Sequence, residues 1–228
     1  MNTHDPRDSY IAQVVQGRSF LEVGGLWGGV NEKVSVAYRF GARRLAIVDV
    51  AKPENQWWEF FRQRMTQMDI KNYDAYAEDI CTVDSVRIGA PFDVVHCSGV
   101  LYHLPDPMRL LAVLRSITIE FCILTSVVIP EVIENEVSCY KLPPSAMVFV
   151  PALTDRERDC LKAYWRQFLG NSVACGITDV ASFSVDDFAP WWWLPTATAL
   201  KAMCRSAGFQ VVDSQPCWNN GALTLLLR

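Results

Sequence analysis

A glycine-rich turn near the N-terminus has the strongest chemical signature in the chain. It holds four glycines in six residues and follows an apolar run and an acidic residue. Glycine lets the backbone approach a ligand closely, and the start of a following helix offers backbone N–H groups for binding. A tight strand-to-helix turn would also use glycine, but four of them beside an acid favour a ligand-binding loop. The candidate binding residues are Glu22, Gly24, Gly25, Leu26, Trp27 and Gly28.

A second carboxylate follows the next apolar run. Asp49 ends the apolar run at residues 44–49, and Val50 comes directly after it. In nucleotide-binding sheets, an acid at the end of the second strand accepts hydrogen bonds from ribose hydroxyls. A solvated loop carboxylate is the alternative. The position after the apolar run favours the ribose role, so Asp49 and Val50 are candidate cofactor-binding residues.

Two histidines lie in or after a later apolar run. His96 falls inside the run at residues 92–98, which predicts a histidine buried in the core. His103 follows the run, at the sheet edge where ligands bind in such folds. An unperturbed imidazole titrates near neutral pH, so His103 is the candidate general base. Shaping the pocket or capping the next helix are its alternative roles.

Three consecutive tryptophans stand near the end of a proline-rich region, at residues 191–193. They cannot all point inward on one regular element, and packing is the default for at least one of them. We expect one or two of them to line a substrate pocket. The candidate substrate-contacting residues are Tyr140, Trp192 and Trp193.

The elements that must position these residues follow from alternating apolar and amphipathic segments. Nearly continuous apolar runs are typical of a parallel sheet buried on both faces, and right-handed crossovers then give a doubly wound α/β fold. Asp106 and Pro107 begin one helix, and Thr196 begins another. We expect strands at 19–23, 44–50, 74–80, 92–98, 121–128, 209–213 and 222–227, and helices at 31–40 and 54–68.

The last two expected strands are joined by a short turn with Asn219, Asn220 and Gly221, which predicts an antiparallel hairpin. The expected fold is therefore a Rossmann-like, doubly wound, seven-stranded sheet, mostly parallel with an antiparallel C-terminal strand. Residues 129–190 interrupt the alternation after the fifth strand, with one helix that Thr154 and Glu157 begin as a capping box. We expect one domain over residues 1–228, in which 129–190 form a lid that defines the substrate.

Composition excludes several other classes of protein. Half of the residues are hydrophobic, 20% are charged and the net charge is −4, which is globular and does not attract polyanions. The polar N-terminus lacks a signal core, and no apolar run has the length of a membrane span. The eight cysteines form no CxxC pair and no zinc-like cluster, so we expect free thiols in a reducing compartment and no metal. The expected protein is cytoplasmic, without a membrane or nucleic-acid partner.

The turn after Glu22 is not the GxGxxG of nicotinamide or flavin enzymes. It resembles the E/D-x-G-x-G-x-G motif of class I S-adenosylmethionine-dependent methyltransferases, with Leu26 in place of the middle glycine. Residues 92–105, and above all 100–104, resemble the fourth strand and following loop of that family. The resemblance implies S-adenosylmethionine as cofactor and S-adenosylhomocysteine as product. It adds as cofactor-binding residues Asp79 at the adenine amino group, Ile80, Ser98, Gly99 and Tyr102.

Residues 193–196 and 207–209 resemble a branch that includes tRNA wobble-uridine methyl- and carboxymethyltransferase-like proteins and small-molecule methyltransferases. We expect methyl transfer to an oxygen, nitrogen or carbon nucleophile of a small or medium-sized acceptor. A tRNA-modifying enzyme and a non-methylating S-adenosylmethionine-binding protein remain the alternatives. The sequence also leaves open a carboxylated donor, which Tyr102 would help to hold, and a homodimer.

Overall fold

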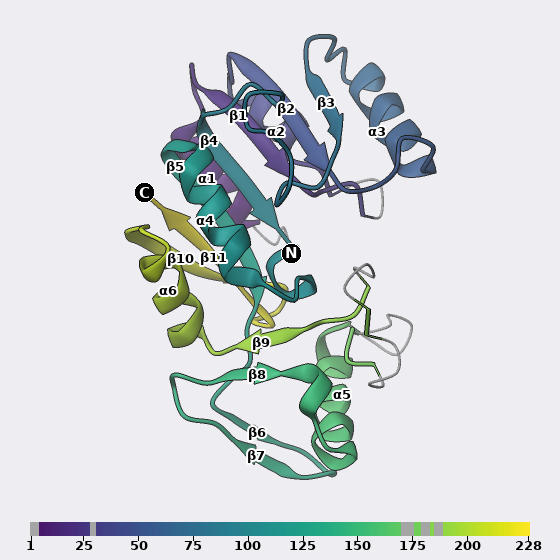
Figure 1. Cartoon of the computed structure of the whole chain (residues 1–228), viewed down its shortest axis with the longest axis vertical. Coiled ribbons are helices and arrows are strands. Elements are labelled where there is room, and N and C mark those ends of the chain that lie inside the picture. Colours follow the sequence, from purple (N-terminus) through teal and green to yellow (C-terminus); the bar gives the residue numbers. More distant parts are fainter. Residues whose placement is uncertain (1–4, 28–30, 170–175, 179–182, 185–188) are drawn as a thin grey trace.

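A seven-stranded sheet forms the centre of the computed structural model, which describes residues 5–27, 31–169, 176–178, 183–184 and 189–228 (Figure 1). The strand order is β3-β2-β1-β4-β5-β11-β10. The pairs β1–β2, β2–β3, β1–β4 and β4–β5 are parallel, and β11 is antiparallel to both β5 and β10. The expected α/β sheet with an antiparallel C-terminal strand is confirmed. Its strands are β1 (Ser19–Val23), β2 (Arg44–Asp49), β3 (Asp74–Ala77), β4 (Phe92–Ser98), β5 (Thr118–Val127), β10 (Val211–Cys217) and β11 (Ala222–Leu227).

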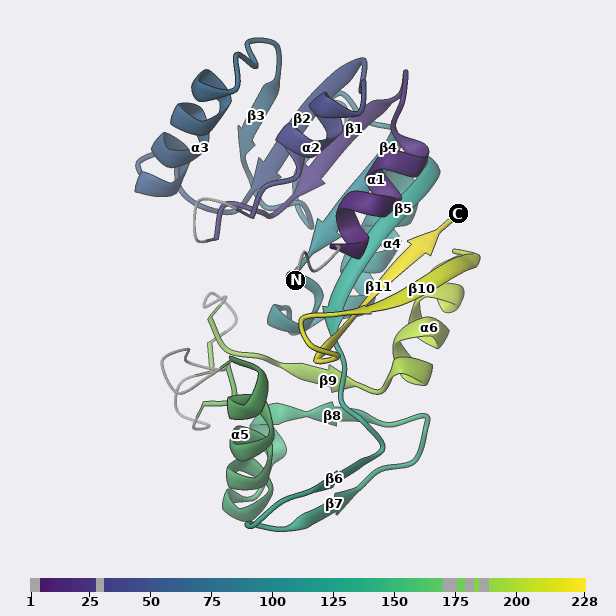
Figure 2. The same cartoon turned by 180° about the vertical axis from the view of Figure 1, so that it is seen from behind.

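Helices cover both faces of the sheet. One face carries α1 (Pro6–Val14), α2 (Val34–Arg39) and α3 (Gln56–Gln67), as Figure 2 shows from behind. The other face carries α4 (Pro107–Ile117) and α6 (Ala197–Ser206). Successive strand residues alternate between the two cores, because side chains in a strand point to opposite faces in turn. Phe20 packs with α1–α3, and Leu21 packs with α4 and α6.

Local signals set the helix starts as the sequence predicts. Asp106 accepts a hydrogen bond from the backbone N of Arg109 at 3.0 Å and so caps α4. Thr196 caps α6 by accepting from the N of Ala199 at 3.1 Å. Each cap satisfies a backbone donor that the first helical turn cannot satisfy itself.

The described residues of the segment 129–190 lie beyond one end of the sheet in Figure 1. The segment contains β6 (Val132–Glu134), β7 (Cys139–Lys141), β8 (Met147–Phe149) and α5 (Asp155–Leu169), which Thr154 and Glu157 begin as expected. Strand β6 pairs with β7, and β8 pairs with β9 (Trp193–Pro195). The sequence did not predict these short strands, because three residues are too few for a periodic pattern.

Several predicted boundaries differ from the structure. The helix expected from residue 31 begins at Val34, and the strand expected at 74–80 ends at Ala77. The strand expected at 209–213 begins at Val211 and continues to Cys217, because its whole length pairs with β11. Helix α1 was not predicted at all, since its polar sequence shows no clear apolar face. Among the described residues, no helix has both the length and the apolarity to cross a membrane.

Candidate functional site

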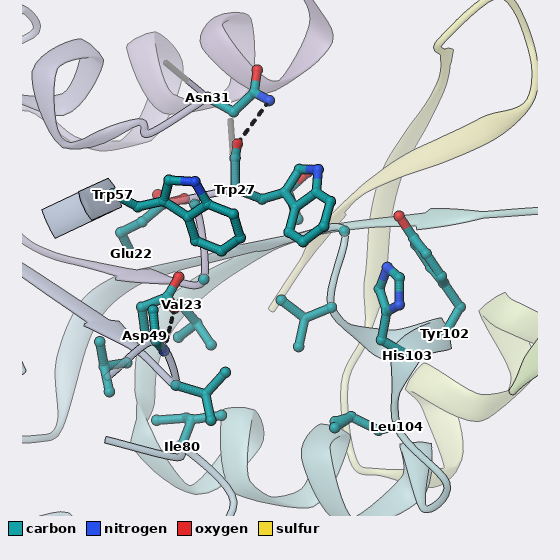
Figure 3. Close-up of a pocket in the computed structure, with 18 of the residues that line it drawn as sticks. Glu22, Val23, Trp27, Asn31, Asp49, Trp57, Ile80, Tyr102, His103 and Leu104 are labelled. Carbon is teal, nitrogen blue, oxygen red and sulfur yellow. Dashed lines mark hydrogen bonds between the residues drawn. The ribbon is translucent and has the colours of Figure 1, made fainter. Parts of the chain in front are cut away.

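A cavity of about 640 Å³ lies at the carboxyl ends of β1, β2, β3 and β4. Each strand ends in a loop whose residues face the same space, as parallel strands direct their carboxyl ends to one edge. Figure 3 shows Glu22 and Asp49 on one side of this space and Tyr102 and His103 on the other. Its volume is typical of a site for a small molecule or cofactor.

Most of the residues predicted to bind the cofactor, together with the candidate base, line this cavity. They come from four separate segments, and the sheet edge brings them together. These residues are Glu22, Gly24, Gly25, Trp27, Asp49, Val50, Asp79, Ile80, Ser98, Gly99, Tyr102 and His103.

One described residue of the predicted glycine turn, Leu26, is not among those that line it. The side chain of Leu26 is 1% exposed and packs in the core between α1–α3 and the sheet. Its backbone N donates to Oδ2 of Asp49 at 3.2 Å, so the residue supports the site through its main chain. Gly28 lies outside the described residues.

The residues predicted to contact the substrate, Tyr140, Trp192 and Trp193, do not line the cavity. Trp191, next to Trp192, does line it. Trp192 donates its backbone N to the carbonyl of Tyr102 at 2.7 Å, and its ring packs on Phe149. Trp193 donates Nε1 to the carbonyl of Pro105 at 3.0 Å. Tyr140 lies on β7 and packs in the core of residues 129–190.

Glu22 forms a completely buried pair with His96 beneath the glycine turn. Oε2 of Glu22 lies 2.8 Å from Nδ1 of His96. Burial, with the nearby Glu32 carboxylate, raises the pKa of Glu22 well above its usual range. Burial likewise lowers the pKa of His96 well below its usual range. The pair is therefore neutral, with an uncharged acid beside an uncharged imidazole.

The second oxygen of Glu22 faces the glycine turn. A Cβ built on Gly25 would lie 2.7 Å from Oε1, and Gly25 has φ +115°, so only glycine fits there without strain. In the described part of the chain, Oε1 is buried and has no hydrogen-bond partner. A buried polar atom without a partner is costly, so this oxygen is suited to a donor supplied by a ligand.

Asp49 stands at the end of β2 in a fixed orientation. Oδ1 accepts from the N of Ala51 at 2.8 Å, and Oδ2 accepts from the N of Leu26 at 3.2 Å. Burial raises the pKa of Asp49, although these backbone hydrogen bonds oppose the shift. The carboxylate has further acceptor capacity and lines the cavity.

Arg7 is the lining residue that the sequence analysis missed most clearly. Its Nε and Nη2 atoms donate to Asp5, and Nη1 donates to Oγ of Ser98 at 3.3 Å. Burial opposes ionisation of Asp5, but hydrogen bonds from Arg7 and Lys33 outweigh it and hold the pKa of Asp5 below its usual range. The N-terminal helix thus brings a fixed guanidinium to the end of β4. No sequence motif predicts this position of Arg7.

The remaining polar groups lie on either side of the cavity. Asp79 accepts from the N of Cys81 at 2.9 Å, in the loop after β3. His103 has Nδ1 3.2 Å from the carbonyl oxygen of Pro190. A carbonyl only accepts, so Nδ1 carries the proton in this contact and Nε2 has the basic lone pair. The part of the chain that the structure describes contains no group of three or more His, Cys, Asp or Glu residues arranged for a metal.

Comparison with known proteins adds evidence at the level of the fold. No protein-family model and no curated protein sequence matches the chain. Solved structures do match, and several of them are methyltransferases by name. One is the 1,6-didemethyltoxoflavin N1-methyltransferase of Burkholderia thailandensis, with 1,6-didemethyltoxoflavin and S-adenosylhomocysteine bound. It is 16% identical, with a TM-score of 0.59 over 98% of this chain and 76% of that one.

The chain has the class I methyltransferase fold. An S-adenosylmethionine-dependent methyltransferase from Mesorhizobium loti gives a TM-score of 0.58 at 12% identity, over 98% of this chain and 96% of that one. The magnesium protoporphyrin IX methyltransferase of Synechocystis PCC 6803, with S-adenosylhomocysteine bound, gives 0.57 at 14% identity, over 97% and 80%. In this fold the cavity lies at the edge where the strand order reverses, which is where ligands bind in doubly wound sheets.

Proposed function

We propose that the protein is an S-adenosylmethionine-dependent methyltransferase with a small or medium-sized acceptor. The observation that carries the proposal is one cavity with an acidic side chain at the end of β1, another at the end of β2 and a third after β3. Glu22, Asp49 and Asp79 therefore stand in sequence along the edge of the sheet. The methyltransferase fold of the chain is consistent with this use of the edge.

The residues present fit the cofactor in charge and shape. Oε1 of Glu22 is a buried acceptor without a described partner, suited to the ammonium of the methionine part. Arg7 offers a guanidinium at the end of β4, suited to the carboxylate of that part. Asp49 would accept from the ribose hydroxyls, and Asp79 with Ile80 would hold the adenine. The glycine turn requires glycine at positions 24 and 25, because each has a positive φ and a Cβ would lie 2.7 Å from a side-chain atom of Val100 or Glu22.

S-adenosylmethionine carries a methyl group on a sulfonium, and transfer of that group to a nucleophile's lone pair breaks the S–CH3 bond and leaves S-adenosylhomocysteine. The protein's contribution is to hold the two reactants together in line. A hydroxyl acceptor must also lose a proton. His103 is placed to take it at Nε2, since the contact with Pro190 assigns the proton on the ring to Nδ1.

Three observations favour a small acceptor over RNA. The cavity is lined by residues from α5 and from the segment before β9 as well as from the sheet, so residues 129–190 would act as the lid that defines the acceptor. The net charge of −4 does not favour a polyanion. The structurally similar toxoflavin and magnesium protoporphyrin enzymes, by their names, act on small molecules.

Calorimetric titration with S-adenosylmethionine and S-adenosylhomocysteine tests the proposal. We expect micromolar binding by the wild type. Asp49→Asn should weaken it by about 1–3 kcal/mol, because hydrogen bonds to a charged acceptor are lost. Asp74→Asn, which changes an exposed aspartate on β3 outside the cavity lining, is the matched control and should bind as the wild type does. Absence of wild-type binding would refute the proposal.

A further inference from the structure

The cavity changes in character along its length. Its described acidic lining residues lie at the carboxyl ends of β1 and β2 and in the loop after β3. The described lining residues that follow Ser98 in the sequence include no aspartate or glutamate, and five of them carry rings. These five residues, called the aromatic chamber, are Tyr102, His103, Trp165, Trp191 and Trp218.

The aromatic chamber is assembled from four distant parts of the chain. Tyr102 and His103 lie in the short 3-10 helix η1 (Leu101–His103) after β4, and Trp165 lies on α5. Trp191 precedes β9, and Trp218 stands in the turn between β10 and β11. The ring centroid of Trp191 is 5.2 Å from that of Tyr102 and 5.0 Å from that of Trp165, both nearly perpendicular. Edge-to-face contacts of this kind fix ring orientations.

Close backbone packing holds the rings in place. A Cβ on Gly221 would lie 2.7 Å from Cζ3 of Trp165, and a Cβ on Gly176 would overlap the ring of Trp191. Gly99 has φ +77°, and a Cβ there would be 3.5 Å from Oη of Tyr102 and 3.8 Å from Cη2 of Trp218. The rings therefore press against glycine backbone, and the walls are formed before any ligand arrives.

Fixed aromatic walls whose described residues carry no carboxylate suit a flat, uncharged or anionic ring system. A cationic acceptor could also bind to aromatic faces, but the guanidinium of Arg7 already lies over the ring of Trp218, 5.6 Å from its centroid, and would repel a second cation. Arg7 is itself paired with Asp5, so the charge of Asp5 is already balanced and does not favour a cationic ligand. Among the five residues of the chamber, His103 has the side chain that can accept a proton from a ligand.

We propose that the acceptor is a planar aromatic or heteroaromatic molecule with an ionisable hydroxyl group, bound in the aromatic chamber with that hydroxyl at His103. The inference rests on the proposed function for its role in methyl transfer, but binding itself does not require the methyl donor. The chamber selects by ring shape, and the imidazole selects the hydroxyl.

Binding of three probes, 2-naphthol, 7-hydroxycoumarin and 8-hydroxyquinoline, to the full chain tests this by calorimetry, with and without S-adenosylhomocysteine. The saturated alcohol 2-decalol and the cation choline are the comparison ligands. We expect at least one aromatic probe to bind about tenfold more tightly than either. Trp218→Leu should weaken that probe about tenfold, and Trp218→Tyr, which retains a ring, should weaken it less. Trp192→Phe, one residue from Trp191 but outside the lining, should stay within about twofold.

The outcomes separate the two proposals. If S-adenosylhomocysteine binds but no aromatic probe does, the acceptor class is wrong and the proposed function stands. If decalol or choline binds as tightly as the aromatic probes, the chamber does not select planar rings and the inference is overturned. If an aromatic probe binds but S-adenosylhomocysteine does not, the chamber is right and the methyl-transfer function is wrong. If neither S-adenosylhomocysteine nor any aromatic probe binds, both the proposed function and the proposed acceptor class are refuted.

Discussion

Oε2 of Glu22 lies 2.8 Å from Nδ1 of His96, and both side chains are fully buried under the glycine turn. The pairing places an acid and an imidazole where neither meets water. Because burial raises the pKa of the acid and lowers that of the imidazole, the pair is held neutral at the centre of the site. A neutral pair is less costly to bury than an ion pair, and it leaves Oε1 to face Gly25.

The raised pKa of Glu22 makes stability depend on pH. Above its ordinary value of 4.5, folded Glu22 keeps a proton that the unfolded chain has lost, so this residue reduces stability as pH rises towards its folded pKa. Glu22→Gln removes this pH-dependent loss of stability, because glutamine does not titrate. We expect the variant to gain stability relative to wild type as pH rises from about 5 to 8, at about 1.4 kcal/mol for each unit of pKa shift. Urea unfolding of ligand-free protein at several pH values measures it.

Glu134→Gln, which alters an exposed glutamate on β6, is the control and should run parallel to wild type at every pH. His96 acts in the opposite direction, because its lowered pKa reduces stability only as pH falls below 6.5. A stability difference between Glu22→Gln and wild type that stays flat from pH 5 to 8 would mean that Glu22 is ionised in the folded protein.

The sequence predicted the sheet well because its strands carry strong local signals. Residues 19–23, 92–98 and 222–227 were each predicted with their observed bounds, since each is an apolar run ended by a glycine, a loop or the end of the chain. The glycine turn and Asp49 were placed at the cavity for the same reason. Position along the chain fixes which edge of a parallel sheet a loop occupies.

The aromatic side of the cavity could not be predicted in the same way. Three adjacent tryptophans have no period, and contacts with distant segments decide their directions: Trp191 donates its backbone N to Gly176, and Trp192 donates to Tyr102. Arg7 was missed because a weakly amphipathic helix gives no signal in its own sequence. Its role comes from Asp5 and Ser98, and Ser98 is 91 residues away.

Arg7 should determine affinity for the amino-acid part of the cofactor. We expect Arg7→Gln to weaken S-adenosylhomocysteine binding about tenfold or more, because a charge-assisted hydrogen bond is lost. Binding of 5′-methylthioadenosine, which lacks the amino-acid part, should change little. Arg64→Gln is the matched control, since Arg64 pairs with Glu32 in the same region but is not a lining residue. Equal losses for both ligands would indicate that Arg7 acts only by holding α1.

Gly25 should be required for binding beyond its effect on stability. Gly25→Ala and Gly17→Ala both place a side chain at positive φ, so each should destabilise the protein by about 1–2 kcal/mol. Only at Gly25 would the new Cβ meet Glu22, whereas nothing lies within 4 Å at Gly17. We therefore expect Gly25→Ala alone to weaken S-adenosylhomocysteine binding, by calorimetry at a temperature where both variants are folded. If the two variants bound S-adenosylhomocysteine with equal affinity, Glu22 and Gly25 would not belong to the binding site.

His103 should matter in proportion to how firmly the acceptor holds its proton. With acceptor hydroxyls of high pKa, we expect His103→Gln to lower kcat about 10²- to 10⁴-fold, the usual contribution of a general base. Acceptors that are already ionised at the assay pH, such as a nitrophenol, have no proton to give and should lose much less. S-adenosylhomocysteine affinity should stay unchanged, which separates a lost base from a damaged pocket. The dependence of the kcat ratio on acceptor pKa is the measurement, and a ratio that is the same for every acceptor would assign His103 to positioning alone.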